Sequence, residues 1–106
     1  MQKICSDTCS VIILNYNGWK DTLACLNKVD ALVTRPRRTI VVDNCSTDDS
    51  IENIMEYWQA PRQAPVIHES EIQYLTAIPE SDNILLVCSR NRGYAAGNNL
   101  GIILAK

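Results

Sequence analysis

The sequence predicts an α/β domain of the Rossmann-like type, a three-layer sandwich with a mostly parallel sheet. Three short apolar runs, at residues 10–15, 39–42 and 84–88, have the composition of buried parallel strands. Each run ends in a polar turn, and apolar residues at helical spacing follow each turn. Because strand–helix–strand connections are right-handed, we expect the successive strands to lie parallel.

The first unit joins the strand at residues 10–15 to a helix predicted over residues 19–32. One stripe of that helix is apolar and the rest is polar or charged; the stripe consists of Trp19, Leu23, Leu26 and Val29. Pro36 disfavours helix at the residue before it, so residues 34–38 form the return loop. We expect the basic residues 35–38 to face water, with a phosphate or membrane contact as the alternative.

The second unit is the stretch TIVVDNCSTDDS at residues 39–50. Its apolar run ends at Asp43 and Asn44, which would lie at the carboxyl end of the strand, where open α/β sheets bind ligands. A helix follows, with Ser46 or Thr47 predicted as its N-cap and with Asp48 and Asp49 in its first turn. The helix is indicated by apolar residues at helical spacing, which are Ile51, Ile54, Met55 and Trp58.

Residues 59–83 carry three prolines between short mixed runs, and we expect a mobile insertion there. A brief strand at residues 65–69 and one or two helical turns at 71–78 are the elements it could hold. The third core strand at residues 84–88 follows, and a last helix runs from residue 94 or 95 to 104. Gly97 and Gly101 within that helix are explained either by close packing on the sheet or by the approach of a ligand.

Composition limits the classes of protein that this chain of 106 residues can represent. That length makes one small domain or part of a larger one. The net charge of −2 gives no sign of a nucleic-acid partner. The apolar runs are too short to cross a bilayer and no secretory signal is recognisable, so we expect a cytoplasmic protein. Five cysteines suit reduced thiols better than a disulfide framework, and no metal site is predicted because the Cys/His pairs of a zinc site are lacking.

The ends of the three predicted strands bring amide, carboxylate, aromatic and guanidinium groups to one edge of the sheet. This mixture suits a nucleoside diphosphate better than a hydrolytic triad, because an Asn amide can both donate to and accept from a pyrimidine ring. Asp43 could bind a ribose hydroxyl or stabilise its loop, and Arg92 could face a phosphate. The glycine-rich dinucleotide fingerprint, the P-loop and the nucleophile elbow are all lacking.

Three segments in this order, SVIILNYNGWKDTLACL, IVVDNCSTDDS and NRGYAAGNNLGI, resemble the opening of a family 2 glycosyltransferase. The resemblance is closest to the rhamnosyltransferase-like branch and leaves residues 59–83 outside it. It implies the N-terminal half of a GT-A fold, which binds a nucleotide-diphosphate sugar such as a UDP- or dTDP-sugar. By the family pattern, Asn44 contacts the pyrimidine with Asp43 as its partner. The nucleotide-binding residues that the resemblance and the strand ends together predict are Leu14, Asn15, Tyr16, Asp43, Asn44, Arg92, Gly93 and Asn98.

The chain departs from the family pattern after the third segment. The acidic D-x-D motif, which holds a divalent cation (Mg or Mn), and the later catalytic base are not identifiable, so no catalytic or metal-binding residue is predicted here. We therefore expect a partial domain, the nucleotide-sugar-binding portion of an inverting enzyme that acts on a glycan or lipid-linked acceptor and is peripheral to the inner face of the membrane or free in the cytoplasm. The alternative is a non-catalytic α/β interaction module. An unpaired edge at residues 11–14 would favour a homodimer.

Overall fold

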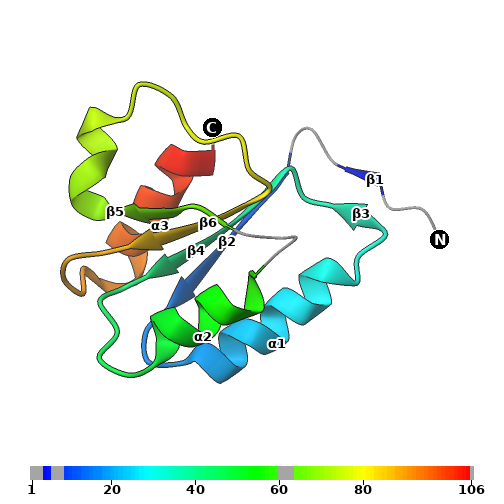
Figure 1. Cartoon of the computed structure of the whole chain (residues 1–106), viewed down its shortest axis with the longest axis horizontal. Coiled ribbons are helices and arrows are strands. Elements are labelled where there is room, and N and C mark those ends of the chain that lie inside the picture. The colour runs from blue at the N-terminus through cyan, green and yellow to red at the C-terminus, as the bar shows by residue number, and fades with distance from the viewer. Residues whose placement is uncertain (1–3, 6–8, 60–63, 106) are drawn as a thin grey trace.

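A four-stranded parallel sheet forms the centre of the computed structural model, which describes residues 4–5, 9–59 and 64–105 (Figure 1). Its strands lie in the order β2, β4, β6, β5, and every neighbouring pair is parallel. Their bounds are β2 (Ser10–Asn15), β4 (Arg38–Asp43), β6 (Asn83–Val87) and β5 (Val66–His68). The α/β prediction with a mostly parallel sheet is confirmed.

The register makes the strands end together. Asn15 pairs with Asp43, Asp43 pairs with Val87, and Val87 pairs with His68. Since parallel strands share one direction, the chain leaves all four strands at the same edge of the sheet. That edge is where the predicted ligand-binding residues were expected.

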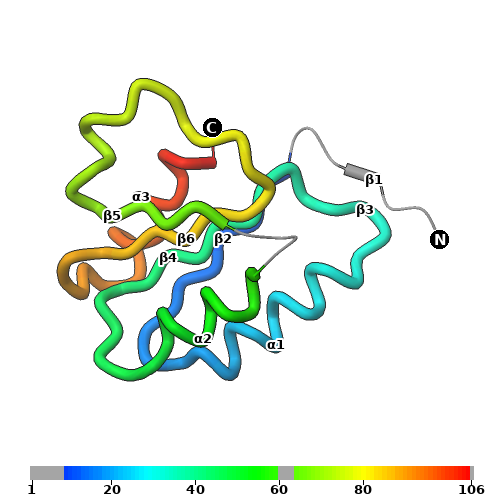
Figure 2. The backbone as a smooth tube through the Cα atoms, in the orientation of Figure 1, coloured from blue at the N-terminus to red at the C-terminus, as the bar shows by residue number. Residues whose placement is uncertain are grey.

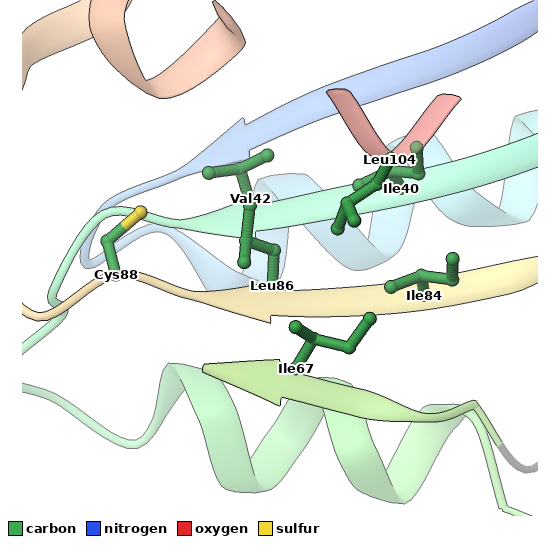
Figure 3. Close-up of a cluster of buried hydrophobic side chains, with 7 residues drawn as sticks. All are labelled: Ile40, Val42, Ile67, Ile84, Leu86, Cys88 and Leu104. Atoms are coloured by element: carbon green, nitrogen blue, oxygen red, sulfur yellow. The ribbon is translucent and has the colours of Figure 1, made fainter. Parts of the chain in front are cut away.

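Helices cover both faces of the sheet, which gives the expected three layers (Figure 1). The first face carries α1 (Trp19–Asp30) and α2 (Ser50–Tyr57), and the second carries α3 (Gly93–Ala105) and the 3-10 turn η1 (Glu69–Tyr74). Alternate residues of β4 feed the two cores, because successive strand side chains point to opposite faces. Val41 packs with the α1 and α2 side chains, and the second core contains Ile40, Val42, Ile67, Ile84, Leu86, Cys88 and Leu104 (Figure 3).

The glycines of α3 allow this helix to lie directly on the sheet. A Cβ atom at Gly101 would lie 2.7 Å from Ile12 Cγ2 and 3.0 Å from Val42 Cγ2, both on stiff β-branched side chains. A Cβ atom at Gly97 would lie 2.6 Å from Leu14 Cδ1, which is the end of a flexible side chain. These contacts support the packing explanation for both glycines.

The helix ends differ from their predicted positions. Helix α2 begins at Ser50, with Asp49 at the N-cap position, so the prediction of Ser46 or Thr47 as the cap is wrong. Both residues instead hydrogen-bond to the loop that follows β2. Helix α1 ends at Asp30 rather than at residue 32. Of the apolar residues at helical spacing, Ile54 and Trp58 are buried in the core, whereas Met55 is 47% exposed.

The basic segment at residues 35–38 is only partly solvated. Arg38 is the first residue of the central strand β4 and is buried, so its prediction as part of a solvated loop is wrong. Its Nη1 donates to the carbonyl oxygen of Leu104 at 2.7 Å, which ties the start of β4 to the end of α3. Arg35 is exposed and lies in the short strand β3 (Thr34–Arg35), which pairs with β1 (Ile4–Cys5).

Residues 59–83 contribute to the sheet instead of forming only an insertion. The predicted brief strand is β5, which pairs with β6, and the predicted helical turns correspond to η1. Residues 60–63 of this segment lie outside the described residues. In the described part of the chain, no helix combines the length and the apolar character needed to cross a membrane.

Candidate functional site

The turns that follow β2, β4 and β6 lie at the same end of the sheet (Figure 2). We call them the strand-end loops: residues 15–18, 43–49 and 88–92. Two backbone hydrogen bonds join these loops at the ends of the strands. The Asn44 N–H donates to the Asn15 carbonyl oxygen at 2.8 Å, and the Cys88 N–H donates to the Asp43 carbonyl oxygen at 2.9 Å.

Asp43 accepts hydrogen bonds from two of its neighbours and is fully buried. Its Oδ1 accepts from Asn15 Nδ2 at 2.9 Å and from Ser46 Oγ at 2.7 Å, and its Oδ2 accepts from the Ser46 N–H at 3.0 Å. Thr22 at the start of α1 donates to Asn15 Oδ1 at 2.6 Å. The carboxylate therefore stabilises the loop after β4, which is one of the two roles that the sequence left open for it.

Asn17 holds the first two strand-end loops together, a role that the sequence prediction missed. Its N–H donates to Ser46 Oγ at 3.0 Å, and its Oδ1 accepts from the Thr47 N–H at 2.8 Å. The residue has a positive φ of 49°, a conformation that Asn adopts more readily than most residues. Asn17 lies two residues after the end of β2 and directly before Gly18, and this Asn-Gly pair was the signal in the sequence for a turn.

Asn44 connects the loop after β4 to the loop after β6. Its Oδ1 accepts from the Arg92 N–H at 3.0 Å, and its Nδ2 donates to Asn91 Oδ1 at 2.9 Å and to the Gly93 carbonyl oxygen at 3.2 Å. The side chain is 2% exposed. Asn44 therefore organises the loop around residues 91–93, and its predicted contact with a pyrimidine stays a prediction.

Arg92 forms an ion pair with Glu69, a residue that the sequence analysis did not select. The Glu69 carboxylate also accepts from the Ser89 N–H at 3.1 Å and from Ser89 Oγ at 3.3 Å. The hydrogen bond from Arg92 lowers the pKa of Glu69, and that interaction raises the pKa of the guanidinium. Glu69 was missed because it belongs to residues 59–83, whose packing onto the sheet the sequence pattern does not reveal.

The remaining predicted residues surround this bonded group. Gly93 begins α3 with a positive φ of 82°, which explains why glycine occupies the position. Tyr16 follows β2 and is 50% exposed. Leu14 lies under α3 at Gly97, and Asn98 is half-buried in the next position of that helix. The structure thus brings Asn15, Asp43, Asn44, Arg92 and Gly93 together through hydrogen bonds, with Leu14, Tyr16 and Asn98 at the same edge.

The described residues do not form a cation site. No group of three or more His, Cys, Asp and Glu side chains among them lies close enough to hold a metal ion. Both oxygens of Asp43 already accept hydrogen bonds from protein groups. Cys88, directly after β6, has its thiol pKa raised to about 11, mainly by burial and then by the charge of Glu69, so it stays protonated at neutral pH. The divalent cation expected for the family therefore does not fit this set of residues.

A separate hollow of about 880 Å³ lies between α2 and the start of β5. The residues that line it lie mainly in or just after α2 and around the start of β5, and they include Met55, Trp58, Pro65 and Val66. None of the predicted nucleotide-binding residues lines it. The hollow and the strand-end loops are therefore different places in the fold.

The parallel sheet, its two helical layers and the polar loops at its carboxyl edge define an α/β domain of the Rossmann-like class. The family model described as "Glycosyl transferase family 2" matches residues 10–106. The chain therefore belongs to glycosyl transferase family 2. The match runs through residues 59–83, which were expected to lie outside the resemblance. No curated protein and no solved structure matches the chain.

Proposed function

We propose that this chain binds a nucleotide-diphosphate sugar at the strand-end loops, as the nucleotide-sugar-binding portion of a glycosyltransferase. The proposal extends to a UDP- or dTDP-sugar, to an enzyme of the rhamnosyltransferase-like branch, and to a glycan or lipid-linked acceptor. The observation that carries it is the joining of the three loops through Asn15, Asp43 and Asn44 at the carboxyl edge of a parallel sheet. Membership of family 2 supports the same reading.

Two side chains have the chemistry to recognise the pyrimidine. Tyr16 offers an aromatic face at an exposed position beside Asn15. Asn44 Oδ1 accepts a hydrogen bond from the Arg92 N–H, and an amide oxygen can accept two. It can therefore also accept from the N3–H group of a uracil or thymine ring. Because Asn44 is buried, a contact with the base requires the loop at residues 91–93 to open.

No residue of this chain is proposed to be catalytic. Transfer of the sugar requires charge stabilisation on the leaving diphosphate and a base for the acceptor hydroxyl. We propose that a divalent cation supplies the former in the full-length enzyme, held by residues other than those described here. The described residues would bind and orient the nucleotide.

Calorimetric titration with UDP, dTDP and ADP tests the proposal. We expect UDP and dTDP to bind at least about tenfold more tightly than ADP, since tenfold corresponds to about 1.4 kcal/mol, the scale of one or two hydrogen bonds to the base. Tyr16→Ala should weaken UDP binding. Tyr74→Ala is the matched control, because Tyr74 is also an exposed tyrosine but lies in η1. Equal affinity for UDP and ADP would overturn the proposal.

The contrasting candidate is a non-catalytic interaction module. It is favoured by the observation that Asp43 and Arg92 already have protein partners at the strand-end loops. In this reading, β2 would be the interacting element, because β4 is its one neighbour among the strands that the structure describes. Light scattering tests the homodimer proposed through this edge. A dimer mass that Val11→Lys converts to a monomer mass would support it, because Val11 lies in β2 but in neither core cluster. A monomer at high concentration would exclude it.

A further inference from the structure

Glu69 places its carboxylate against a group of donors typical of anion sites. These donors are the Ser89 N–H, the Ser89 hydroxyl and the guanidinium of Arg92, which we call the Ser89–Arg92 cluster. A backbone N–H, a hydroxyl and a guanidinium are also the groups that bind phosphate oxygens in proteins. The Glu69 side chain is 12% exposed, so the carboxylate covers these donors rather than lying loosely over them.

The Ser89–Arg92 cluster is attached to the proposed nucleotide site. The Arg92 N–H donates to Asn44 Oδ1 at 3.0 Å, and Asn44 is the residue predicted to contact the base. Ser89 is exposed and Arg92 is 29% exposed, so both can be reached from solvent. A phosphate bound at this cluster would therefore lie close to a nucleoside bound at Asn44.

The ion pair with Glu69 does not satisfy all the hydrogen-bond donors of the Ser89–Arg92 cluster. Arg92 Nε is buried and has no hydrogen-bond partner among the described residues. A guanidinium has five N–H donors and binds carboxylate or phosphate best in a bidentate way. An anion that contacts both Nε and a terminal nitrogen would satisfy this donor.

We propose that Glu69 is an intramolecular competitor of the nucleotide's diphosphate at the Ser89–Arg92 cluster. This inference rests on the proposed function, and it adds to that function a residue that lowers the affinity for the phosphate groups. Glu69 occupies the cluster in the ligand-free protein, and a diphosphate must displace it to reach Arg92. Because the pKa of Glu69 lies below its usual value, the competing group is an anion at neutral pH.

The competitor has a clear consequence for binding. Glu69→Gln removes the negative charge and keeps the shape of the side chain. It should raise the affinity for inorganic pyrophosphate and for UDP about tenfold, because a charge-assisted hydrogen bond of about 1.5 kcal/mol corresponds to roughly that factor. The affinity for uridine, which has no phosphate, should not change.

The experiment is calorimetric titration of the 106-residue chain and its variants with inorganic pyrophosphate, uridine, UDP and ADP. Glu71→Gln is the matched control: it makes the same charge change in the same η1 turn, but Glu71 accepts from the His68 N–H at 2.9 Å and is exposed. Glu69→Asp is a second variant, in which the shorter side chain moves the carboxylate away from Arg92 and Ser89. It should give a gain in pyrophosphate affinity smaller than that of Glu69→Gln. Adding Arg92→Gln to Glu69→Gln should abolish the gain.

The outcomes separate this inference from the proposed function. The inference is overturned if Glu69→Gln binds pyrophosphate no more tightly than the unmodified chain and the Glu71→Gln control do. It is also overturned if none of the three proteins binds pyrophosphate. If pyrophosphate affinity rises but neither uridine nor UDP binds with pyrimidine selectivity, the competitor is supported and the nucleotide function fails. If UDP is selected over ADP and Glu69→Gln has no effect, the function stands and the competitor is excluded.

Discussion

Replacing Asn44 with alanine tests how far one side chain organises the strand-end loops. The substitution removes hydrogen bonds to three groups: the Arg92 N–H, Asn91 Oδ1 and the Gly93 carbonyl oxygen. Each bond contributes about 0.5–1.5 kcal/mol net, and the half-buried Arg92 N–H is the group that water replaces least easily. We expect Asn44→Ala to lower the free energy of unfolding by about 2–3 kcal/mol.

For a domain of this size, that loss corresponds to a fall in Tm of about 10–20 °C. Circular dichroism during heating measures the fall, and hydrogen exchange should show a faster rate at the Arg92 amide. Asn99→Ala is the matched control, because Asn99 is exposed on α3 and alanine favours the helix. A Tm for Asn44→Ala within about 2 °C of the unmodified chain would refute the bonding role assigned to Asn44.

Two further predictions concern the core between the sheet and α3. Gly101→Ala should lower the free energy of unfolding by about 1 kcal/mol, because overpacking costs about 1–3 kcal/mol and replacing glycine by alanine in a helix returns about 1 kcal/mol. Gly97→Ala should be nearly neutral, because the Leu14 side chain that it meets is flexible. Equal urea midpoints for the two variants would contradict the packing described for α3. Because the pKa of Cys88 is raised from 9.0 to about 11 in the fold, its contribution to stability is complete below pH 9 and is lost as the pH rises to 11. Urea midpoints between pH 8 and 10.5 should therefore fall more steeply for the unmodified chain than for Cys88→Ala, and parallel slopes would count against a buried, protonated thiol.

The strands of the central sheet could be predicted because their signal is local. The runs at residues 10–15 and 39–42 are apolar and β-branched, and they became β2 and β4 with little change in bounds. The convergence of Asn15, Asp43 and Asn44 followed from the parallel order of these strands. That part of the site needed only strand positions and the handedness of the connections.

The missed features depend on contacts between residues distant in the sequence. Glu69 pairs with Arg92 only because β5 joins the sheet beside β6. The proline-bearing segment that contains β5 has no clear periodicity of apolar residues, so its place in the sheet could not be predicted from the sequence. Arg38 looked like part of a basic surface run, yet it begins the central strand and donates to Leu104. Ser46 resembles an N-cap in the sequence, but the carboxylate of Asp43 and the turn at Asn17 use its hydrogen-bonding groups first.

Amide chemical shifts measured by NMR during a UDP titration show directly whether a pyrimidine nucleotide binds at the strand-end loops. We predict shift changes at Tyr16, Asn44, Ser89 and Arg92, and unchanged shifts at Trp58 and Val66 beside the hollow. The same titration with ADP should change the shifts of Tyr16 and Asn44 only at concentrations at least about tenfold higher. Shifts confined to the residues around that hollow, or equal shifts with ADP at the same concentration, would show that the strand-end loops are not a pyrimidine-nucleotide site.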